Sequence, residues 1–405
     1  MNARVLRPVW IGACGLTLTA CGSGQDPADP LEPVDTTAAP QGPQPTVVAS
    51  VPIPPNYGIH DTFVRDGIAF VCAWNTGVIL FDVGNGIRNG APSAPVEISR
   101  LVTETTAGFT GARAHNAWWF HNPGAGEKRY LFVGQEGPAV VGFNSTGDIH
   151  VVDVSDLANP VQVARYHMTG TSQPAGAHNF WMDETAQILY AAFYNGGVVA
   201  LDVSGTLAGD LAGREIARIA PAAGATYIWG VHLMGGWLYA VDMLNGFYQL
   251  ELAGGSLTVR TGGGNVTERF SSDLWVHGTA AYTGTWGTRG ANPGNVVKVW
   301  DLSGGGAPTL ADSVVLSTIG TVSDVQVSVD GKQLVFTSEN GPGAGVHVYS
   351  LADPLHPAFT ARHGLGDQGF HTGTVADIGG KRYVFTAKNP PDPQLVIYDI
   401  TALIP

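Results

Sequence analysis

The sequence predicts an all-β fold, a seven-bladed β-propeller of four-stranded blades, from three observations. A short apolar run that closes on an acidic or hydroxyl residue occurs seven times. The closing residues are spaced by 71 residues and then by 49 or 50: Asp82, Asp153, Asp202, Glu251, Asp301, Ser350 and Asp399. No segment has the apolar spacing and caps of a long amphipathic helix. A fixed period of this size is typical of a repeat architecture.

Each repeat contains four strand-like runs, as the third copy shows. These are residues 178–182, 188–193, 198–202 and 214–220. The turn at 195–197, Asn-Gly-Gly, separates the second and third runs, because Asn and Gly accept positive φ at little cost. The composition agrees, with 55 Gly, 26 Pro and 13% charged residues. Four short strands in about 50 residues describe one propeller blade.

The last repeat ends at Pro405, directly after its third strand, and therefore lacks an outer strand. Residues 46–52 are strand-like and precede the first inner strand. They resemble residues 160–166, the outer strand of the second copy. We expect the N-terminal strand to complete the last blade and close the ring, which removes exposed sheet edges.

The recurring acidic residue follows the third strand of each blade. A side chain in that place is suited to accept backbone hydrogen bonds from the turn. Because a functional group rarely recurs in every repeat, we interpret this position as structural.

The N-terminal region predicts export and a lipid anchor. Residues 1–20 have the arginines and apolar stretch of a signal peptide. Leu18-Thr19-Ala20-Cys21 matches a bacterial lipobox, which predicts lipidation of Cys21. Gly22 follows, so by resemblance to Gram-negative lipoproteins the outer membrane is the expected destination. Residues 21–44 are rich in Pro, Ala and Asp and predict a flexible tether, which leaves residues 45–405 for the propeller.

Net charge limits the classes of partner, and the cysteines have separate expected roles. The formal net charge is −13, which disfavours nucleic acid as a partner. The expected partners are the membrane, through the lipid anchor, and an envelope protein, a glycan or a small ligand. Cys72 lies in a predicted strand and is expected to be a buried apolar residue.

Two segments resemble the LVIVD-repeat proteins of bacteria. They are residues 149–160, Ile-His-Val-Val-Asp-Val-Ser-Asp-Leu-Ala-Asn-Pro, and residues 395–400, Leu-Val-Ile-Tyr-Asp-Ile. Weaker copies extend the resemblance over residues 58–400, with Glu251 and Ser350 departing from the pattern. The resemblance implies a propeller-like fold and no single activity.

Histidine opens four of the seven predicted inner strands. His60, His115, His178 and His371 take this position in blades one, two, three and seven, which are neighbours around the ring. Four imidazoles would then converge at one side of the channel mouth, where three or four of them would bind a transition metal such as zinc, copper or iron. In the alternative, each histidine bonds a backbone carbonyl and is structural. Asp61, Asp273 or Asp324 could add an oxygen or orient a ring.

Loops between the second and third strands are expected to form a cleft over this mouth. The longest are residues 135–147, 284–295, 339–345 and 388–393. Tryptophans 118, 275 and 286 lie near the inner strands or these loops. We expect five residues to contact a ligand at the channel mouth: Trp119, Trp229, Asp324, Asn116 and Asn179.

The positions of the other histidines do not favour a shared site. Those in outer strands or turns are expected at the surface: His121, His150, His167, His347, His356 and His363. His232 lies three residues beyond the aligned start of its strand and is expected to face away from the channel.

Two functional hypotheses remain open at this point. In the first, the protein is a lipid-anchored envelope propeller that binds a protein, glycan or small ligand through its loop-rich face. In the alternative, it is a metal-dependent hydrolase or oxidoreductase that uses the histidine cluster. Propellers host both classes, so the fold does not decide between them, and no catalytic residue is assigned.

Overall fold

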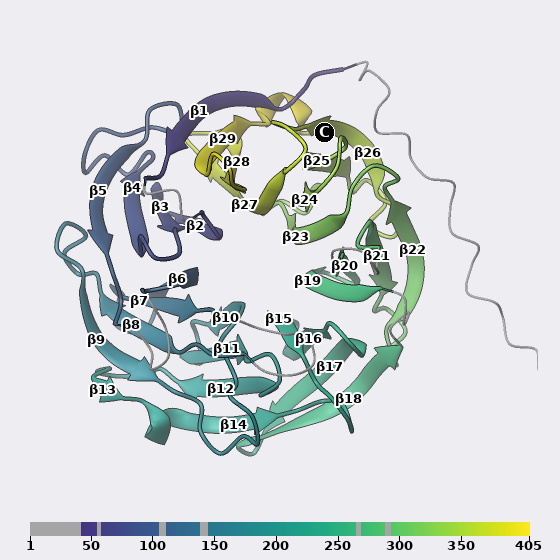
Figure 1. The fold of residues 1–405 in the computed structure, drawn as a ribbon. Coiled ribbons are helices and arrows are strands. Elements are labelled where there is room, and N and C mark those ends of the chain that lie inside the picture. Colours follow the sequence, from purple (N-terminus) through teal and green to yellow (C-terminus); the bar gives the residue numbers. More distant parts are fainter. Residues whose placement is uncertain (1–41, 55–57, 105–110, 138–144, 265–268, 288–292) are drawn as a thin grey trace, which may run out of the picture.

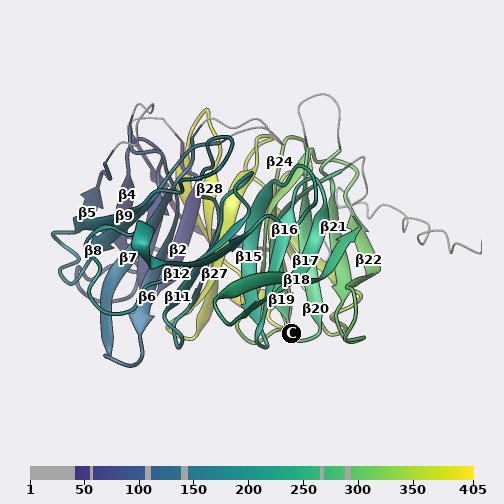
Figure 2. The same cartoon turned by 90° about the horizontal axis from the view of Figure 1, so that it is seen from below.

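A computed structural model of the chain describes residues 42–54, 58–104, 111–137, 145–264, 269–287 and 293–405. The predicted signal peptide, Cys21 and most of the tether lie outside the described residues. The described strands form seven sheets around a central channel (Figure 1). Figure 2 shows the ring from the side, with the strands crossing its thickness. The predicted seven-bladed propeller is confirmed.

The first three blades follow one another along the chain. Blade 1 contains β2 (Asp61–Arg65), β3 (Ile68–Cys72), β4 (Val78–Asp82) and β5 (Val96–Leu101). Blade 2 contains β6 (Ala114–Asn122), β7 (Glu127–Gln135), β8 (Ile149–Asp153) and β9 (Val161–Tyr166). Blade 3 contains β10 (Phe180–Asp183), β11 (Ile188–Ala192), β12 (Val198–Asp202) and β14 (Glu215–Ile219). The 3-10 turn η1 (Ala212–Arg214) directly precedes β14.

The next three blades repeat the same order. Blade 4 contains β15 (Ile228–Met234), β16 (Trp237–Asp242), β17 (Gly246–Ala253) and β18 (Ser256–Gly264). Blade 5 contains β19 (Phe270–His277), β20 (Ala280–Trp286), β21 (Val296–Asp301) and β22 (Thr309–Val315). Blade 6 contains β23 (Thr321–Val327), β24 (Gln333–Glu339), β25 (Gly345–Ser350) and β26 (Ala358–His363). In each blade the first strand lies beside the channel (Figure 1).

Blade 7 joins the two ends of the chain, as predicted. It contains β27 (Phe370–Ile378), β28 (Lys381–Lys388), β29 (Gln394–Asp399) and β1 (Thr46–Pro52), and η2 (Thr401–Leu403) follows β29. β1 pairs antiparallel with β29, from Thr46 opposite Asp399 to Pro52 opposite Gln394. The backbone of β29 is therefore paired on both sides.

The apolar core lies between neighbouring blades. One cluster joins Phe70 and Leu80 of blade 1 to Leu131 and Val133 of blade 2, and all four are fully buried. Burial of such a side chain contributes about 1.5–3 kcal/mol. Cys72 lies in the same cluster and is the free cysteine of the described residues, in agreement with its predicted role.

The recurring acidic residue stabilises the turn after the third strand, as predicted. A carboxylate oxygen accepts the N–H two residues later in five blades: Asp82 from Gly84 at 3.0 Å, Asp153 from Ser155 at 3.0 Å, Asp202 from Ser204 at 2.8 Å, Asp301 from Ser303 at 2.8 Å and Asp399 from Thr401 at 2.9 Å. Ser350 accepts the Ala352 N–H in the same way at 3.3 Å. Glu251, which has a longer side chain, pairs instead with Arg260 at 3.4 Å.

Blade 2 carries an additional edge strand that the sequence pattern did not predict. β13 (Gly209–Asp210) comes from the connection after β12 and runs parallel to β9. Leu207 and Leu211 flank β13, and both are buried in the cluster between blades 2 and 3. Their burial holds this connection against the edge of β9.

Two histidines expected at the surface are buried, which corrects the prediction. His150 in β8 and His347 in β25 are both fully buried. The third strand of a blade is covered on both faces by the adjacent blades, so a polar residue there lies inside. His347 stacks on Phe336, with ring centroids 4.6 Å apart, and its Nε2 lies 2.8 Å from Ser338 Oγ. His167 and His356 are exposed, as expected.

Removal of β1 tests ring closure. We expect a chain that lacks residues 46–52 to melt several degrees lower and to self-associate, because β29 then presents unpaired backbone groups. Thermal unfolding and light scattering at several protein concentrations measure both effects. A chain that begins at Gly42 keeps β1 and is the control. A deletion variant that stays monomeric with an unchanged melting temperature would contradict the closure.

The pH dependence of stability at Asp82 tests whether the recurring carboxylate stabilises its turn. Its two carboxylate oxygens accept five backbone N–H groups, at 2.7–3.2 Å, from residues 84, 85, 86, 88 and 90. Burial raises the pKa of Asp82, but these bonds outweigh burial and lower the pKa to about 2. Because the folded-state pKa lies below the ordinary value of 3.8, the stabilisation is present above about pH 4 and is lost as the pH falls through about 2.

We therefore expect Asp82→Asn to lower the free energy of unfolding by about 2 kcal/mol at neutral pH, and by much less near pH 2.5. Urea unfolding at both pH values measures the difference. Asp301→Asn is the matched control, since Asp301 caps its turn through the Ser303 N–H. An Asp82→Asn effect of the same size at both pH values would show that the carboxylate charge is unimportant.

Candidate functional site

The inner strands begin irregularly, and this irregularity decides which side chains face the channel. The pairing register slips between Ala114 and Asn116 in β6, between Ile228 and Gly230 in β15, and between Val322 and Asp324 in β23. β19 and β27 slip at the equivalent place. Such a bulge places two residues opposite a single residue of the neighbouring strand, and it changes the direction in which a side chain points. In blades 1 and 3 the backbone bonds from His60 to Cys72 and from His178 to Ala192 start the strand in a similar way. Successive residues line the same narrow part of the channel: His60 with Asp61, His178 with Asn179, Ser323 with Asp324, and His371 with Thr372.

The first layer of side chains holds the four predicted histidines, and the structure brings them together. The ring of His60 lies 3.9 Å from that of His115 and 4.1 Å from that of His371, measured between centroids. The ring of His178 lies 4.1 Å from that of His115. The Nε2 atoms of His60 and His371 are 2.9 Å apart. His115 and His178 are each 1% exposed, whereas His371 is partly exposed.

A carboxylate that the sequence analysis did not single out completes this layer. Glu136 Oε2 lies 3.5 Å from His60 Nε2 and 3.9 Å from His115 Nε2. The other oxygen, Oε1, accepts a hydrogen bond from the Tyr194 hydroxyl at 2.6 Å. Candidate ligand atoms of His60, His115 and Glu136 all lie within 4.8 Å of one another. Two imidazoles and one carboxylate are a donor set found in catalytic metal sites.

A second carboxylate orients His371. Glu339 Oε1 lies 2.7 Å from His371 Nδ1, and Asn389 donates to Glu339 Oε2 at 2.9 Å. Glu136 and Glu339 both lie where the second strand of a blade ends and the loop to the third strand begins. Two of the long loops predicted from the sequence, 135–147 and 339–345, contain these two residues, so their shared position at a loop edge is the signal by which they could have been found.

Hydrogen bonds fix the ring orientation of His178 as well. Its Nδ1 lies 2.5 Å from the carbonyl oxygen of Trp229, so this nitrogen carries the proton and Nε2 keeps its lone pair. In contrast, neither ring nitrogen of His115 has a hydrogen-bond partner, and Nδ1 of His60 also has none, although all three atoms are buried. Buried polar atoms are normally satisfied, because leaving one without a partner costs about 1–3 kcal/mol.

Burial and charge set the protonation of the cluster. Burial lowers the pKa of His60 and His178 well below the ordinary value, and it lowers that of His115 to about 3. Burial also disfavours the charged form of His371, yet Glu339 and Glu136 raise its pKa. The first three imidazoles are therefore neutral at pH 7, with lone pairs able to coordinate a cation.

A cavity of about 350 Å³ lies over this layer, at the mouth formed by the loops between second and third strands. Its aromatic walls come from several blades: Trp74, Tyr194, Tyr227, Trp229 and Trp286. The rings of Trp229 and Trp286 lie 5.0 Å apart. The predicted cleft is present where the loops are described. Residues 138–144 and 288–292 of two predicted loops lie outside the described residues.

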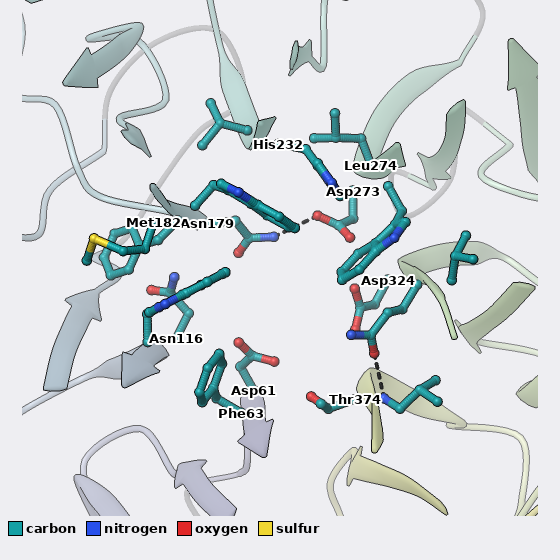
Figure 3. A pocket seen from close by; sticks show the side chains of 18 of the residues that line it. Asp61, Phe63, Asn116, Asn179, Met182, His232, Asp273, Leu274, Asp324 and Thr374 are labelled. Carbon is teal, nitrogen blue, oxygen red and sulfur yellow. Dashed lines mark hydrogen bonds between the residues drawn. The ribbon is translucent and has the colours of Figure 1, made fainter. Parts of the chain in front are cut away.

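A larger cavity, of about 690 Å³, lies on the other side of the histidine layer. Figure 3 shows its polar end, where Asp61, Asn116, Asn179, Asp273 and Asp324 surround the space. Burial raises the pKa of Asp61 to about 8 and that of Asp273 well above its ordinary range, and Asp324 contributes to both shifts. Burial also raises the pKa of Asp324. Three uncharged imidazoles and His371 thus form one side of the constriction, and carboxyl groups form the other.

The binding candidates are divided between these two spaces, and one lies in neither. Trp229 lines the loop-side cavity, whereas Asn116, Asn179 and Asp324 line the larger one. Trp119 packs between blades 1 and 2, is 4% exposed, and donates its indole N–H to the Lys128 carbonyl. Its placement at the channel mouth was therefore wrong.

The bulge explains the two orientations that the sequence analysis assigned incorrectly. Once two successive residues face the channel, the period of two continues from the second residue. In blade 2 this points Trp118 into the larger cavity and Trp119 away from it. In blade 4 it points His232 into the same cavity, where the imidazole stacks on Trp181 at 3.6 Å. The expectation that His232 faces away was wrong for this reason.

Comparisons with known proteins support the fold. The chain is similar to the computationally designed Ika8 protein, with 8% identity and a TM-score of 0.51 over 89% of this chain and 98% of that one. It is also similar to the C-terminal WD40 domain of Sif2, with 10% identity and a TM-score of 0.56 over 87% of this chain and 98% of that one. At these identities the likeness shows the propeller fold alone. No family model and no curated protein matches the chain, so the LVIVD-repeat resemblance stays a prediction.

Proposed function

We propose that the protein binds a transition metal ion at the loop-side mouth of its channel and uses it on a small ligand admitted through the aromatic cavity. His60, His115 and Glu136 are the central ligands, and the adjacent His178 and His371 complete the set. The observation that carries this proposal is His115: both its ring nitrogens are buried without a partner, 3.9 Å from the ring of His60. A bound cation satisfies these atoms.

The surrounding hydrogen bonds support a metal site over four structural histidines. Metal-bound histidines usually donate their second nitrogen to a carboxylate or a carbonyl. His371 meets Glu339 in this way, and His178 meets the Trp229 carbonyl. Tyr194 restrains Glu136. The alternative, in which each histidine bonds a backbone carbonyl, fits His178 but leaves His115 unexplained.

The donor types select zinc, copper or iron rather than calcium or magnesium, because imidazole suits these ions. Two histidines and a carboxylate occur both in zinc hydrolases and in non-haem iron oxygenases. The proposed activity is therefore a metal-dependent hydrolase or oxidoreductase. The chain's own residues shield the ion from bulk water and present it to the loop-side cavity.

A binding module without catalysis is the second candidate. The propeller fold is compatible with it, and the aromatic walls of the loop-side cavity favour it, since flat rings hold small organic or sugar ligands at low entropic cost. Under this hypothesis a bound metal ion holds the side chains at the channel mouth in place and takes no part in a reaction. Turnover of ester, phosphoester or reduced substrates by the metal-loaded protein separates the two candidates.

The metal content of the full chain, purified without a histidine tag, tests the proposal. We expect elemental mass spectrometry to find close to one zinc, copper or iron ion per chain, and about tenfold less in His60→Ala/His115→Ala. His356→Ala is the matched control, because His356 is exposed and pairs with Asp312 away from the channel. Circular dichroism checks that each variant folds.

Two outcomes would contradict this proposal. One is a wild-type protein that is free of metal and also takes up none of the three ions from solution. The other is a folded double variant that keeps the full metal content.

We further propose that the chain is held at the cell envelope, in the outer membrane, through a lipid on Cys21. The supporting observation is the lipobox at residues 18–21 followed by Gly22. In the described part of the chain, no helix has the length and apolar character needed to span a membrane. An acyl anchor of several chains gives stable attachment where one chain is marginal.

Replacement of the lipobox cysteine tests the anchor. We expect Cys21→Ser, expressed in a Gram-negative host, to lose radiolabelled palmitate and to move from the membrane to the soluble fraction. Cys72→Ser is the control, since Cys72 is buried in the propeller. Equal labelling of wild type and Cys21→Ser would overturn the assignment.

A further inference from the structure

We infer that the end of the channel opposite the loop-side mouth holds a second site, which binds a neutral pyranose sugar. The site is the cavity of about 690 Å³, and its volume lies within the range of about 300–1,000 Å³ that small-molecule sites occupy. Its features are a curved wall of aromatic rings, N–H groups along that wall without an acceptor, and a polar floor that both donates and accepts. This site is independent of the proposed metal site.

The aromatic wall is continuous over five adjacent blades. Phe63 lies 5.2 Å from Trp118, and Trp118 lies 5.3 Å from Trp181, measured between ring centroids. His232 stacks on Trp181 at 3.6 Å and lies 4.9 Å from Trp275. Phe63 and the three tryptophans are partly exposed, so part of each side chain remains available to a ligand in the cavity.

The angles between these rings favour a puckered ligand over a flat one. Neighbouring ring planes are inclined by 42° between Phe63 and Trp118, by 59° between Trp118 and Trp181, and by 75° between Trp181 and Trp275. The rings therefore form a curved wall, whereas a planar aromatic ligand needs a slot with parallel sides. A pyranose carries C–H groups on both faces, and these pack against the electron-rich face of an aromatic ring.

Two N–H groups along the wall have no acceptor. Burial lowers the pKa of His232 to about 3, so its imidazole is neutral. Its Nδ1 accepts the Val276 N–H at 3.3 Å, which places the proton on Nε2 at the tip of the ring. His232 is 1% exposed, and neither its Nε2 nor the indole Nε1 of Trp118 has a hydrogen-bond partner. Such donors suit a ligand that brings oxygen acceptors.

The polar floor offers both donors and acceptors (Figure 3). Asn179 donates to Asp273 at 2.8 Å. Burial and the adjacent Asp324 raise the pKa of Asp273 well above its ordinary range, so this pair holds a proton and can donate as well as accept. Gln326 accepts a backbone N–H through Oε1, which leaves its amide N–H groups without a partner among the described residues. Hydroxyl groups donate and accept in the same way, so a sugar matches this floor.

The charges at the wall favour a neutral ligand over an anion. Arg65 is the only arginine or lysine among the described residues that line the cavity, and both of its terminal nitrogens are bonded to Glu184. No arginine or lysine is then left there to balance a carboxylate or a phosphate group. The narrow part of the channel, about 50 Å³, is too small to hold a sugar, so the two cavities are separate sites.

Binding of three neutral glycosides to the full chain tests for this site: methyl β-D-glucoside, methyl β-D-galactoside and methyl α-D-mannoside. Tryptophan fluorescence and calorimetry, with and without a metal chelator, measure the dissociation constants. We expect at least one glycoside to bind with a dissociation constant on the order of 1 mM. The chelator should leave this value unchanged, because the metal ligands lie on the other side of the constriction. Cyclohexanol, which has a saturated ring and a single hydroxyl group, should bind at least about tenfold more weakly.

Substitutions at Trp118 locate the bound sugar. Trp118→Phe keeps a ring but loses the N–H donor, so we expect binding to weaken about threefold. Trp118→Leu loses both, and we expect a loss of about tenfold. Trp286→Leu is the matched control, since Trp286 lines the loop-side cavity and should not contact the sugar. Circular dichroism checks folding, and Trp181→Leu, at the next ring of the wall, replaces Trp118→Leu if that variant does not fold.

Three results would overturn the assignment of this site. The first is that none of the three glycosides binds. The second is that cyclohexanol binds as tightly as the glycosides, which would mean that the floor recognises no hydroxyl groups. The third is that binding is lost in Trp286→Leu but kept in the folded variant of the aromatic wall, which would place the sugar in the loop-side cavity.

Discussion

The bulged start of the inner strands is the feature on which the channel depends. In a regular strand, successive side chains point to opposite faces, so each blade would offer the channel one residue at a time. The slip in register lets His115 and Asn116, or Ser323 and Asp324, face it together. The channel is thereby closed by two polar layers of different chemistry. Ring closure by β1 fixes these layers, since it holds blade 7 and His371 against blade 1.

The two layers divide the channel electrostatically. Burial keeps His60, His115 and His178 neutral, which makes them ligands rather than charges. On the other side, burial raises the pKa of Asp61, Asp273 and Asp324, and the nearby Asp324 raises that of the other two further. The proposed metal site and a cavity lined by carboxyl groups then lie back to back in one channel, and each has its own aromatic walls.

The sequence repeat made the fold predictable. Positions that differ between the repeats made part of the site predictable. The 49-residue period identified the blades, the closing strand and the turn aspartates, because backbone pairing repeats with the sequence. The four histidines stood out because they break that repetition. Glu136 and Glu339 were missed, since each is a single acidic residue at a loop edge. Trp119 and His232 were assigned the wrong direction, because a bulge leaves no mark in the sequence and reverses the alternation that follows it.

The histidine layer is proposed to coordinate a transition metal ion. Anomalous diffraction from crystals of the full chain, recorded above and below the zinc, copper and iron edges, tests it most directly. We expect one anomalous peak about 2.0–2.2 Å from ring nitrogens of His60 and His115 and from a carboxylate oxygen of Glu136. Crystals soaked with each ion that show no peak there, or a peak held by surface residues alone, would contradict it.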